Sequence, residues 1–339
     1  MTFPLQQAPD STANHRAPRY QVQQTPNGPV VVRLPDLPAL PINAMQANSA
    51  ALVHPVAAWR AWIALLRLDR PVGIYLLLWP TICALLLANG GAPSAKLILI
   101  FTLGTLLMRS AGCVVNDYAD QWLDGAVKRT SARPLVSGAL SPRTAVITFI
   151  VLLLLSLALV SLTNQSTMIY ALAAACIAIA YPYCKRHTYM PQAVLGLAFS
   201  MGIPMAYTAS GLTPDAICWL LFCANWIWTL AYDTLYAMAD RADDEIAGAK
   251  STAILFGDLD LLAVSIMFVM LLLTLVAMAR ISFLNVYFYV GLGLIALQFA
   301  AQIFYARGRE PERCFRAFLA NQWVGLTLFL SVLAGLQAF

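Results

Sequence analysis

Two short acidic stretches hold the side chains best suited to chemistry in this sequence. Eight of the 16 Asp and Glu residues lie in them, and six of these eight recur at spacings of three, four or seven residues. On a helix with 3.6 residues per turn, such spacings bring the carboxylates of each stretch onto one face. The six are Asp117, Asp120 and Asp124 in the first stretch and Asp233, Asp240 and Asp244 in the second.

Carboxylates stacked along one helix face repel one another, so a partner must compensate for their charge. Hard divalent cations do so, and Mg²⁺ typically takes one or two carboxylates together with phosphate oxygens. We therefore predict that all six Asp residues are metal ligands, that two Mg²⁺ ions hold one diphosphate, and that four of the six are catalytic. These four are Asp120, Asp124, Asp240 and Asp244. In the alternative interpretation the acids are solvated and pair with nearby Arg residues, but their recurrence in two stretches favours the metal site.

Basic residues stand close to both acidic stretches. A diphosphate needs such donors, because Arg binds two oxygens at once and Lys acts as a point charge. Each basic residue taken alone is also explained as a marker of membrane orientation. The predicted diphosphate-binding residues are Arg129, Arg133, Lys185, Arg186, Arg241 and Lys250.

The rest of the sequence predicts the elements that must position these residues. The chain has 339 residues, of which 60% are hydrophobic and 11% charged, and this composition excludes a water-soluble globule. Its apolar runs are long enough to cross about 30 Å of hydrocarbon, so we predict an all-α polytopic membrane bundle of about nine transmembrane helices. The spans are expected near residues 71–92, 97–115, 144–163, 167–184, 192–212, 216–234, 261–279, 281–305 and 317–338.

The charge distribution predicts the orientation of the chain. Most Lys and Arg residues near the spans fall on the side of the acidic stretches, which places these loops and the N-terminus in the cytoplasm. We expect a bacterial inner membrane, with a mitochondrial inner membrane and matrix-facing loops as the alternative. The net charge of +5 includes no basic run or basic-aromatic face, so nucleic acid is not an expected partner.

The N-terminal part of the chain differs in composition. Residues 1–56 carry nine of the 19 Pro residues and are predicted to be a disordered tail, with residues 57–339 as the transmembrane domain. Within that domain the two acidic stretches align at an offset of 116 residues. This echo indicates two four-helix pseudo-repeats with a ninth helix added.

The motifs around the acidic stretches resemble the UbiA superfamily of intramembrane aromatic prenyltransferases. The first signature, N-D-x-x-D-x-x-x-D followed by R-T-x-x-R-P-L, lies in residues 116–135, and the second, Y-D-T-x-Y-A-M-x-D-R-x-D-D, lies in residues 232–244. Segments typical of the branch that acts on 4-hydroxybenzoate are residues 67–81, 181–192 and 250–257. Ala242 departs from the pattern, since relatives often have a carboxylate there, so the second metal site rests on Asp240 and Asp244.

The resemblance implies nine helices around a central cavity that opens to membrane lipid, where Mg²⁺ holds the diphosphate of a long polyprenyl donor. The allylic C–O bond would ionise, and the carbocation would alkylate 4-hydroxybenzoate ortho to its phenol, in ubiquinone biosynthesis. Asn116 and Tyr236, within the signatures, join the substrate-binding candidates. The carboxylate of the acceptor needs a cation, for which Arg67, Arg70 and Arg186 are candidates and Arg186 is preferred, because it follows a span end in a segment typical of the branch.

Two other functions remain open at this point. A secondary transporter also combines internal repeats with charges at helix breaks, but here the acids lie at span ends instead of the midplane. Superfamily members that act on haem, menaquinone or tocopherol precursors share the first signature. The assignment of the acceptor therefore rests on the branch-specific segments.

Overall fold

The computed structural model describes residues 20–25, 28–33, 55–121, 130 and 132–337. The chain divides into two units, residues 1–52 and 53–339. In the first unit, β1 (Tyr20–Thr25) and β2 (Gly28–Arg33) pair as an antiparallel hairpin. The prediction of a disordered tail did not include this hairpin, and the other residues of the first unit lie outside the described part of the chain.

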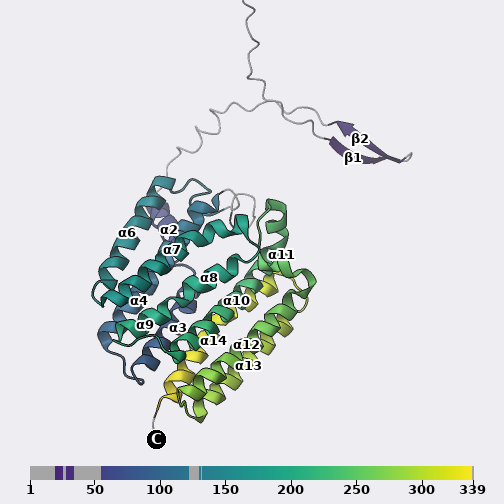
Figure 1. Cartoon of the computed structure of the whole chain (residues 1–339). Helices are drawn as coiled ribbons and strands as arrows, with labels where there is room; N and C mark the ends of the chain where they lie inside the picture. The colour runs from purple at the N-terminus through teal and green to yellow at the C-terminus, as the bar shows by residue number, and fades with distance from the viewer. Residues whose placement is uncertain (1–19, 26–27, 34–54, 122–129, 131, 338–339) are drawn as a thin grey trace, which may run out of the picture. The chain divides into compact units, whose positions relative to one another are not determined.

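The second unit is a bundle of α-helices throughout its described residues (Figure 1). A 3₁₀ turn, η1 (Gly257–Leu259), lies between α11 and α12. The helices are α2 (Pro55–Leu65), α3 (Val72–Ala88), α4 (Ala95–Ala119), α6 (Pro142–Val160), α7 (Gln165–His187), α8 (Pro191–Ser200), α9 (Gly202–Ala209), α10 (Ala216–Ala247), α11 (Thr252–Phe256), α12 (Asp260–Ile281), α13 (Val286–Ala306) and α14 (Pro311–Gly335).

Each of the nine expected spans coincides with helix, although the count of nine is met only approximately. Seven helical segments in the described residues are long and apolar enough to cross a membrane, and α3 is a shorter apolar helix of 17 residues. The expected fifth span is divided at Met201 into α8 and α9. Pro204 explains the division, because it has no N–H to donate to the carbonyl of Ser200 and its ring crowds that carbonyl.

Large apolar side chains on the outer helices face away from the bundle. Leu154 of α6, Leu172 of α7, Leu273 of α12 and Leu297 of α13 are each at least 60% exposed. Such a surface would be unfavourable in water but suits hydrocarbon. The chain is therefore a multi-pass membrane protein.

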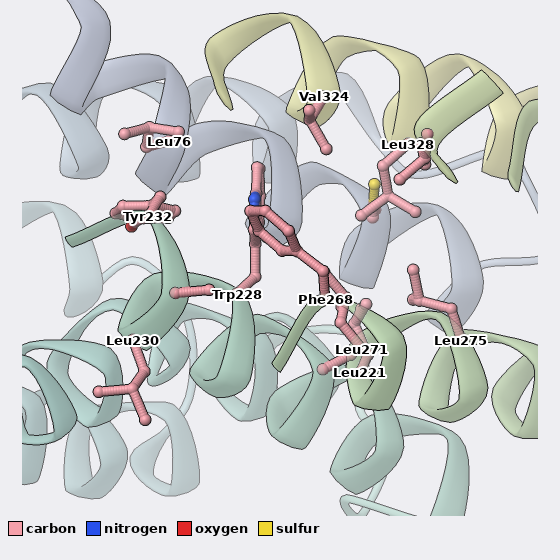
Figure 2. Packing of buried hydrophobic residues seen from close by; sticks show 14 of the residues in the cluster. Leu76, Leu221, Trp228, Leu230, Tyr232, Phe268, Leu271, Leu275, Val324 and Leu328 are labelled. Atoms are coloured by element: carbon pink, nitrogen blue, oxygen red, sulfur yellow. The ribbon is translucent and has the colours of Figure 1, made fainter. Parts of the chain in front are cut away.

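The core forms around α10, which packs against α8, α12 and α14. Figure 2 shows Trp228 of α10 between Phe268 and Leu271 of α12 and Val324 and Leu328 of α14, and Trp228 is only 1% exposed. Lipid tails are as apolar as these side chains, so helix association in a membrane depends on close packing and interhelical hydrogen bonds.

A buried hydrogen-bonded junction joins α10, α13 and α14. The Trp228 indole N–H donates to Oδ1 of Asn321 on α14 at 2.8 Å. Nδ2 of Asn321 donates to Oε1 of Gln302 on α13 at 3.0 Å and to the carbonyl of Ala317 at 3.0 Å. Asn321 is fully buried, and its amide fixes the register of α10, α13 and α14.

Candidate active site

A cavity of about 1350 Å³ lies inside the bundle. Most of its wall is apolar, from residues of α3, α4, α6, α7, α8 and α14, while one end carries charged side chains. Eleven of the predicted site residues line it: Arg67, Arg70, Asn116, Asp117, Arg133, Lys185, Asp233, Tyr236, Asp240, Asp244 and Lys250. Segments that are far apart in the sequence therefore meet at one polar end, as the motif positions predict.

Asp117, at the end of α4, lies between two guanidinium groups. Arg67 donates through Nη2 to Oδ1 and Oδ2 of Asp117 at 2.9 and 3.0 Å, and Arg133 donates through Nη1 to Oδ1 at 2.8 Å. The carboxylate is only 2% exposed. Asp117 thus shares its one negative charge between two cations, and its metal role stays a prediction that competes with these contacts.

Asp120 pairs with a Lys from another helix. Lys185 of α7 donates through Nζ to Oδ2 of Asp120 at 2.5 Å, and Asp120 is 1% exposed. Lys185 lines the cavity while Asp120 lies behind it. Asp124 and Arg129, which sequence reasoning also assigned to the site, lie outside the described residues, so their roles stay predictions.

The second acidic stretch lies on one continuous helix, α10. Asp233, Asp240 and Asp244 all line the cavity. Tyr236 lines it between them, and its ring meets Phe318 of α14 edge-on with a centroid separation of 5.0 Å. The 3.6-residue period therefore brings these carboxylates to the cavity wall, as the spacing predicts, and their role as metal ligands stays a prediction.

Two predicted substrate-binding residues are not among those that line the cavity. Arg186 donates to the carbonyl of Ala119 at 2.8 Å and lies over the ring of Tyr183. Arg241 is bound to Asp260. Both guanidinium groups bind groups of the protein itself, so their direct contacts with substrate stay predictions, as does the preference for Arg186 at the acceptor carboxylate.

Sequence reasoning missed Arg109, a cation of α4 that lines the cavity. It donates through Nη1 to the Cys113 sulfur at 2.6 Å, and its buried Nε has no hydrogen-bond partner. Gly73 of α3 makes room for it, because a Cβ there would lie 2.0 Å from Nε. An ionisable residue within an apolar run is a signal for function, and this signal is present in the sequence.

Arg109 precedes Asn116 by seven residues, which is roughly 10 Å along a helix. Asn116 also lines the cavity, and its buried Oδ1 accepts no hydrogen bond. One unpaired donor and one unpaired acceptor therefore lie along the same helix at different depths. Buried polar groups without partners are rare, and because these two also line the cavity, each is a candidate contact for a bound ligand.

The residues present fit Mg²⁺. Asn116 offers a free carbonyl oxygen, and the α10 wall offers carboxylates, which are the hard oxygen ligands that Mg²⁺ prefers. In the described residues, no group of three or more His, Cys, Asp or Glu side chains is arranged to hold a metal ion. An Mg²⁺ ion bound here would therefore need water and substrate phosphate oxygens to complete its shell.

Fold and site together define a class of protein: a multi-pass helical membrane protein with a largely apolar cavity, or chamber, that has charged residues at one end. We call this end, around Asp117, Arg133, Lys185, Asp240 and Lys250, the charged pole. Such a chamber suits a long apolar molecule with an anionic head. Comparison with known families agrees, because the UbiA prenyltransferase family matches residues 77–333. The chain belongs to the UbiA prenyltransferase family, as the motifs indicate.

Curated relatives are similar over most of the chain. The 4-hydroxybenzoate octaprenyltransferase of Pseudomonas aeruginosa (strain UCBPP-PA14) is 52% identical over 287 residues, which is 84% of this chain and 95% of the relative. The protein of the same name from Xanthomonas campestris pv. campestris (strain B100) is 48% identical over 286 residues, with the same two coverages.

Solved structures share the fold. The apo structure of a UbiA homolog from Aeropyrum pernix K1 has a TM-score of 0.69 at 23% identity and covers 77% of this chain and 96% of its own. A UbiA homolog from Archaeoglobus fulgidus, bound to GPP and Mg²⁺, has a TM-score of 0.62 at 19% identity and covers 80% of this chain and 99% of its own. At these identities the likeness establishes the fold alone.

Proposed function

We propose that this protein transfers a polyprenyl group from polyprenyl diphosphate to the ring carbon ortho to the phenol of 4-hydroxybenzoate, in ubiquinone biosynthesis. The observation that carries the proposal is that one and the same cavity has carboxylates and cations at one end and an apolar interior. The names of the curated relatives support the acceptor, and the Mg²⁺ and GPP named for the Archaeoglobus homolog support a metal and a prenyl donor.

The donor diphosphate binds at the charged pole. Mg²⁺, proposed as two ions, supplies Lewis-acid stabilisation of the charge that develops on the leaving diphosphate. Lys185 and Lys250 of this chain add further positive charge from the cavity wall. The residues proposed to hold the ions are Asp233, Asp240 and Asp244 with Asn116. The metal roles of Asp117, Asp120 and Asp124 stay predictions, since Asp117 and Asp120 already pair with basic side chains and Asp124 lies outside the described residues.

The apolar part of the cavity takes the prenyl chain and excludes water from the reacting carbon. As the allylic C–O bond breaks, its electron pair leaves with the diphosphate. The ring carbon of the acceptor then bonds to the allylic carbon, and the ring loses a proton. The wall of this part carries four aromatic rings, which keep water from competing for the allylic carbocation. They belong to Phe101, Phe199, Phe315 and Phe318.

The acceptor carboxylate needs a cation within the cavity. Arg67 is already paired with Asp117, and Arg70 is 65% exposed. Arg109 lies in the cavity with an unpaired buried Nε. We therefore assign the acceptor carboxylate to Arg109 in place of Arg186.

The proposed location is a bacterial inner membrane, with the charged pole facing the cytoplasm. The excess of Lys and Arg on that side and the bacterial relatives support it. A mitochondrial inner membrane, with the pole facing the matrix, is the alternative. This orientation puts the site within reach of a water-soluble aromatic acid.

Product formation tests the function. Purified protein in detergent is incubated with 4-hydroxybenzoate, geranyl diphosphate and Mg²⁺, and the products are identified by mass spectrometry. We expect prenylated hydroxybenzoate and released diphosphate, both abolished by EDTA and by Asp240→Asn. Uptake of 4-hydroxybenzoate into proteoliposomes without any covalent product would instead favour a transporter.

A further inference from the structure

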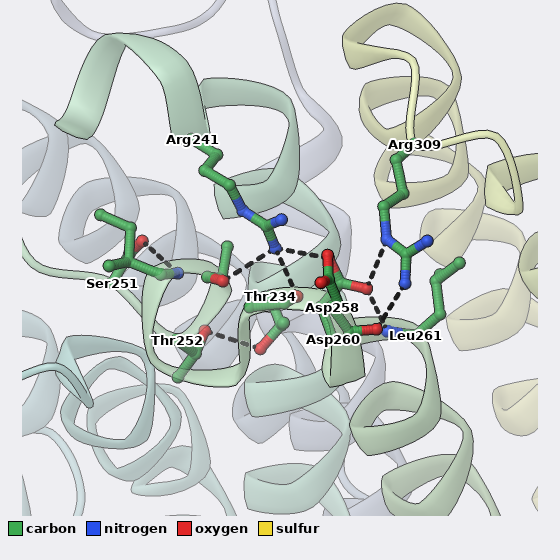
Figure 3. A network of polar contacts seen from close by, with 11 residues as sticks. Thr234, Arg241, Ser251, Thr252, Asp258, Asp260, Leu261 and Arg309 are labelled. Atoms are coloured by element: carbon green, nitrogen blue, oxygen red, sulfur yellow. Dashed lines mark hydrogen bonds and ion pairs between the residues drawn. The ribbon is translucent and has the colours of Figure 1, made fainter. Parts of the chain in front are cut away.

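Three charged residues form a cluster around the buried carboxylate of Asp260, and none of the three is among the residues that line the cavity. Asp260, the first residue of α12, is fully buried and accepts hydrogen bonds from Nη2 of Arg241 and, at 2.9 Å, from Nε of Arg309 (Figure 3). Nη2 of Arg309 also donates to the carbonyl of Asp258 at 2.6 Å. We name these three residues, Arg241, Asp260 and Arg309, the Asp260 cluster.

Arg241 donates hydrogen bonds to two backbone carbonyls in addition to Asp260. Its Nη2 also donates to the carbonyl of Ala253 at 2.8 Å and to the carbonyl of Gly257 at 3.2 Å. These carbonyls lie in and just after the short helix α11, and each also accepts a backbone N–H, Ala253 from Gly257 and Gly257 from Asp260. One guanidinium therefore ties α10 to the segment that follows it and to the start of α12.

The tie fixes the turn of α10 that carries the acidic wall. Arg241 follows Asp240 directly and precedes Asp244 by three residues. Asp240 and Asp244 line the cavity, whereas the Arg241 side chain contacts Asp260. A rotation of this helix end would move both carboxylates, and the tether on its flank opposes that rotation.

The same tie fixes the loop that carries Lys250. Gly248 ends α10 with a left-handed φ of 72°, and Lys250 then lines the cavity. The Lys250 N–H donates to the carbonyl of Lys185 at 3.0 Å, and the Thr252 N–H donates to Oε1 of Gln192 at 3.1 Å. The loop is thus held at Ala253 and Gly257 by Arg241 and at its start by α7 and α8.

We propose that Arg241 is a positioning residue, which acts through Asp260 and the α11 carbonyls to hold Asp240, Asp244 and Lys250 in place for the Mg²⁺–diphosphate group, without touching substrate itself. This inference rests on the proposed function of the cavity. A misplacement of reacting groups by about 1 Å costs up to about 100-fold in rate. A broken tether therefore has a measurable effect on donor binding.

A double-mutant cycle tests the inference. Arg241→Gln, Asp260→Asn and the double variant are compared by KM for geranyl diphosphate, half-activating Mg²⁺ concentration and KM for 4-hydroxybenzoate. We expect each single variant to raise the first two values by about 10- to 100-fold, with the acceptor KM within about twofold of wild type. The double variant is no worse than the worse single one, and Arg241→Lys, which keeps the charge, recovers part of the loss.

A direct diphosphate contact gives a different result. In that case Arg241→Gln raises the donor KM while Asp260→Asn leaves it near the wild-type value, and the inference is overturned. Arg309→Gln is the matched control, since Arg309 binds the same carboxylate and the carbonyl of Asp258, both of which lie outside α10. We expect it to lower Tm but to leave the donor KM within about twofold; an increase equal to that of Arg241→Gln would show a general loss of stability and contradict the positioning role.

A binding measurement keeps this test separate from the proposed function. Mg²⁺ with inorganic diphosphate is expected to raise the Tm of the wild-type protein and of Arg309→Gln, but not of Arg241→Gln or Asp260→Asn. A wild-type protein that forms no prenylated product would refute the function, whereas equal stabilisation of all four proteins would refute the positioning role.

Discussion

Asp117→Asn is the substitution whose effect follows most directly from the geometry. Asn keeps the volume and one acceptor oxygen, but it removes the charge that faces Arg67 and Arg133 at 2.8–3.0 Å. Removing one partner of a buried ion pair destabilises a protein by about 3–5 kcal/mol, because a buried charge is left uncompensated. The two Arg side chains keep 18% and 14% exposure, so we expect the lower figure, about 3 kcal/mol.

Thermal unfolding of the purified protein in detergent, without Mg²⁺, measures this effect. At about 2 °C per kcal/mol, the value for larger domains, Tm falls by about 6 °C. Asp69→Asn is the matched control, since Asp69 is 42% exposed and lies 3.7 Å from Arg70. An exposed pair of this kind contributes about 0–1 kcal/mol, so the Tm of the control stays within about 2 °C of wild type.

The result also decides between two roles of Asp117. A carboxylate that serves first as a metal ligand would leave Tm without Mg²⁺ unchanged in Asp117→Asn and would abolish the rise in Tm that Mg²⁺ and diphosphate cause. A fall of less than about 2 °C without Mg²⁺ would refute the reasoning from the ion pairs.

Three further predictions concern the charged pole. Asp240→Asn lowers turnover at least about 100-fold and raises the Mg²⁺ requirement, because a carboxylate of the cavity wall is lost; near-normal turnover in a Mg²⁺ titration would contradict a ligand role. Arg109→Ala is expected to raise the KM for 4-hydroxybenzoate at least about tenfold with little change in the donor KM, whereas Arg186→Ala leaves the acceptor KM nearly unchanged. A raised acceptor KM in Arg186→Ala but not in Arg109→Ala would return the acceptor carboxylate to Arg186, as predicted from the sequence. Ala139→Cys, in a variant without native cysteines, is expected to resist a membrane-impermeant maleimide in intact spheroplasts and to react after permeabilisation, because the proposed orientation places the exposed loop before α6 in the cytoplasm; labelling before permeabilisation would reverse that orientation.

The helices and their order were predictable because apolar length and helical spacing are local properties of a sequence. The division between α8 and α9 was missed, although Pro204 is visible in the sequence, because hydropathy averaged over a window does not register one missing N–H. Helical spacing correctly predicted that Asp233, Asp240 and Asp244 line one wall.

Spacing alone did not predict the partners of the charged residues. It gives the direction of a side chain around its own helix but not which helix lies opposite. Asp117 and Asp120 share a helix end, yet one meets Arg67 and Arg133 and the other meets Lys185. These pairs join segments up to 65 residues apart, so only the folded structure reveals them.

The junction at Asn321 has a consequence for the insertion of the nascent chain into the membrane. Among the described helices α14 leaves the ribosome last, yet it supplies the oxygen that accepts the Trp228 indole N–H and the rings of Phe315 and Phe318 that line the cavity. Until α14 enters the bilayer, α10 holds an indole N–H without that acceptor, at a cost of several kcal/mol in hydrocarbon. A nascent chain stopped before residue 311 is therefore an open bundle without a complete chamber. Insertion of α14 therefore completes both the junction at Asn321 and the lining of the cavity.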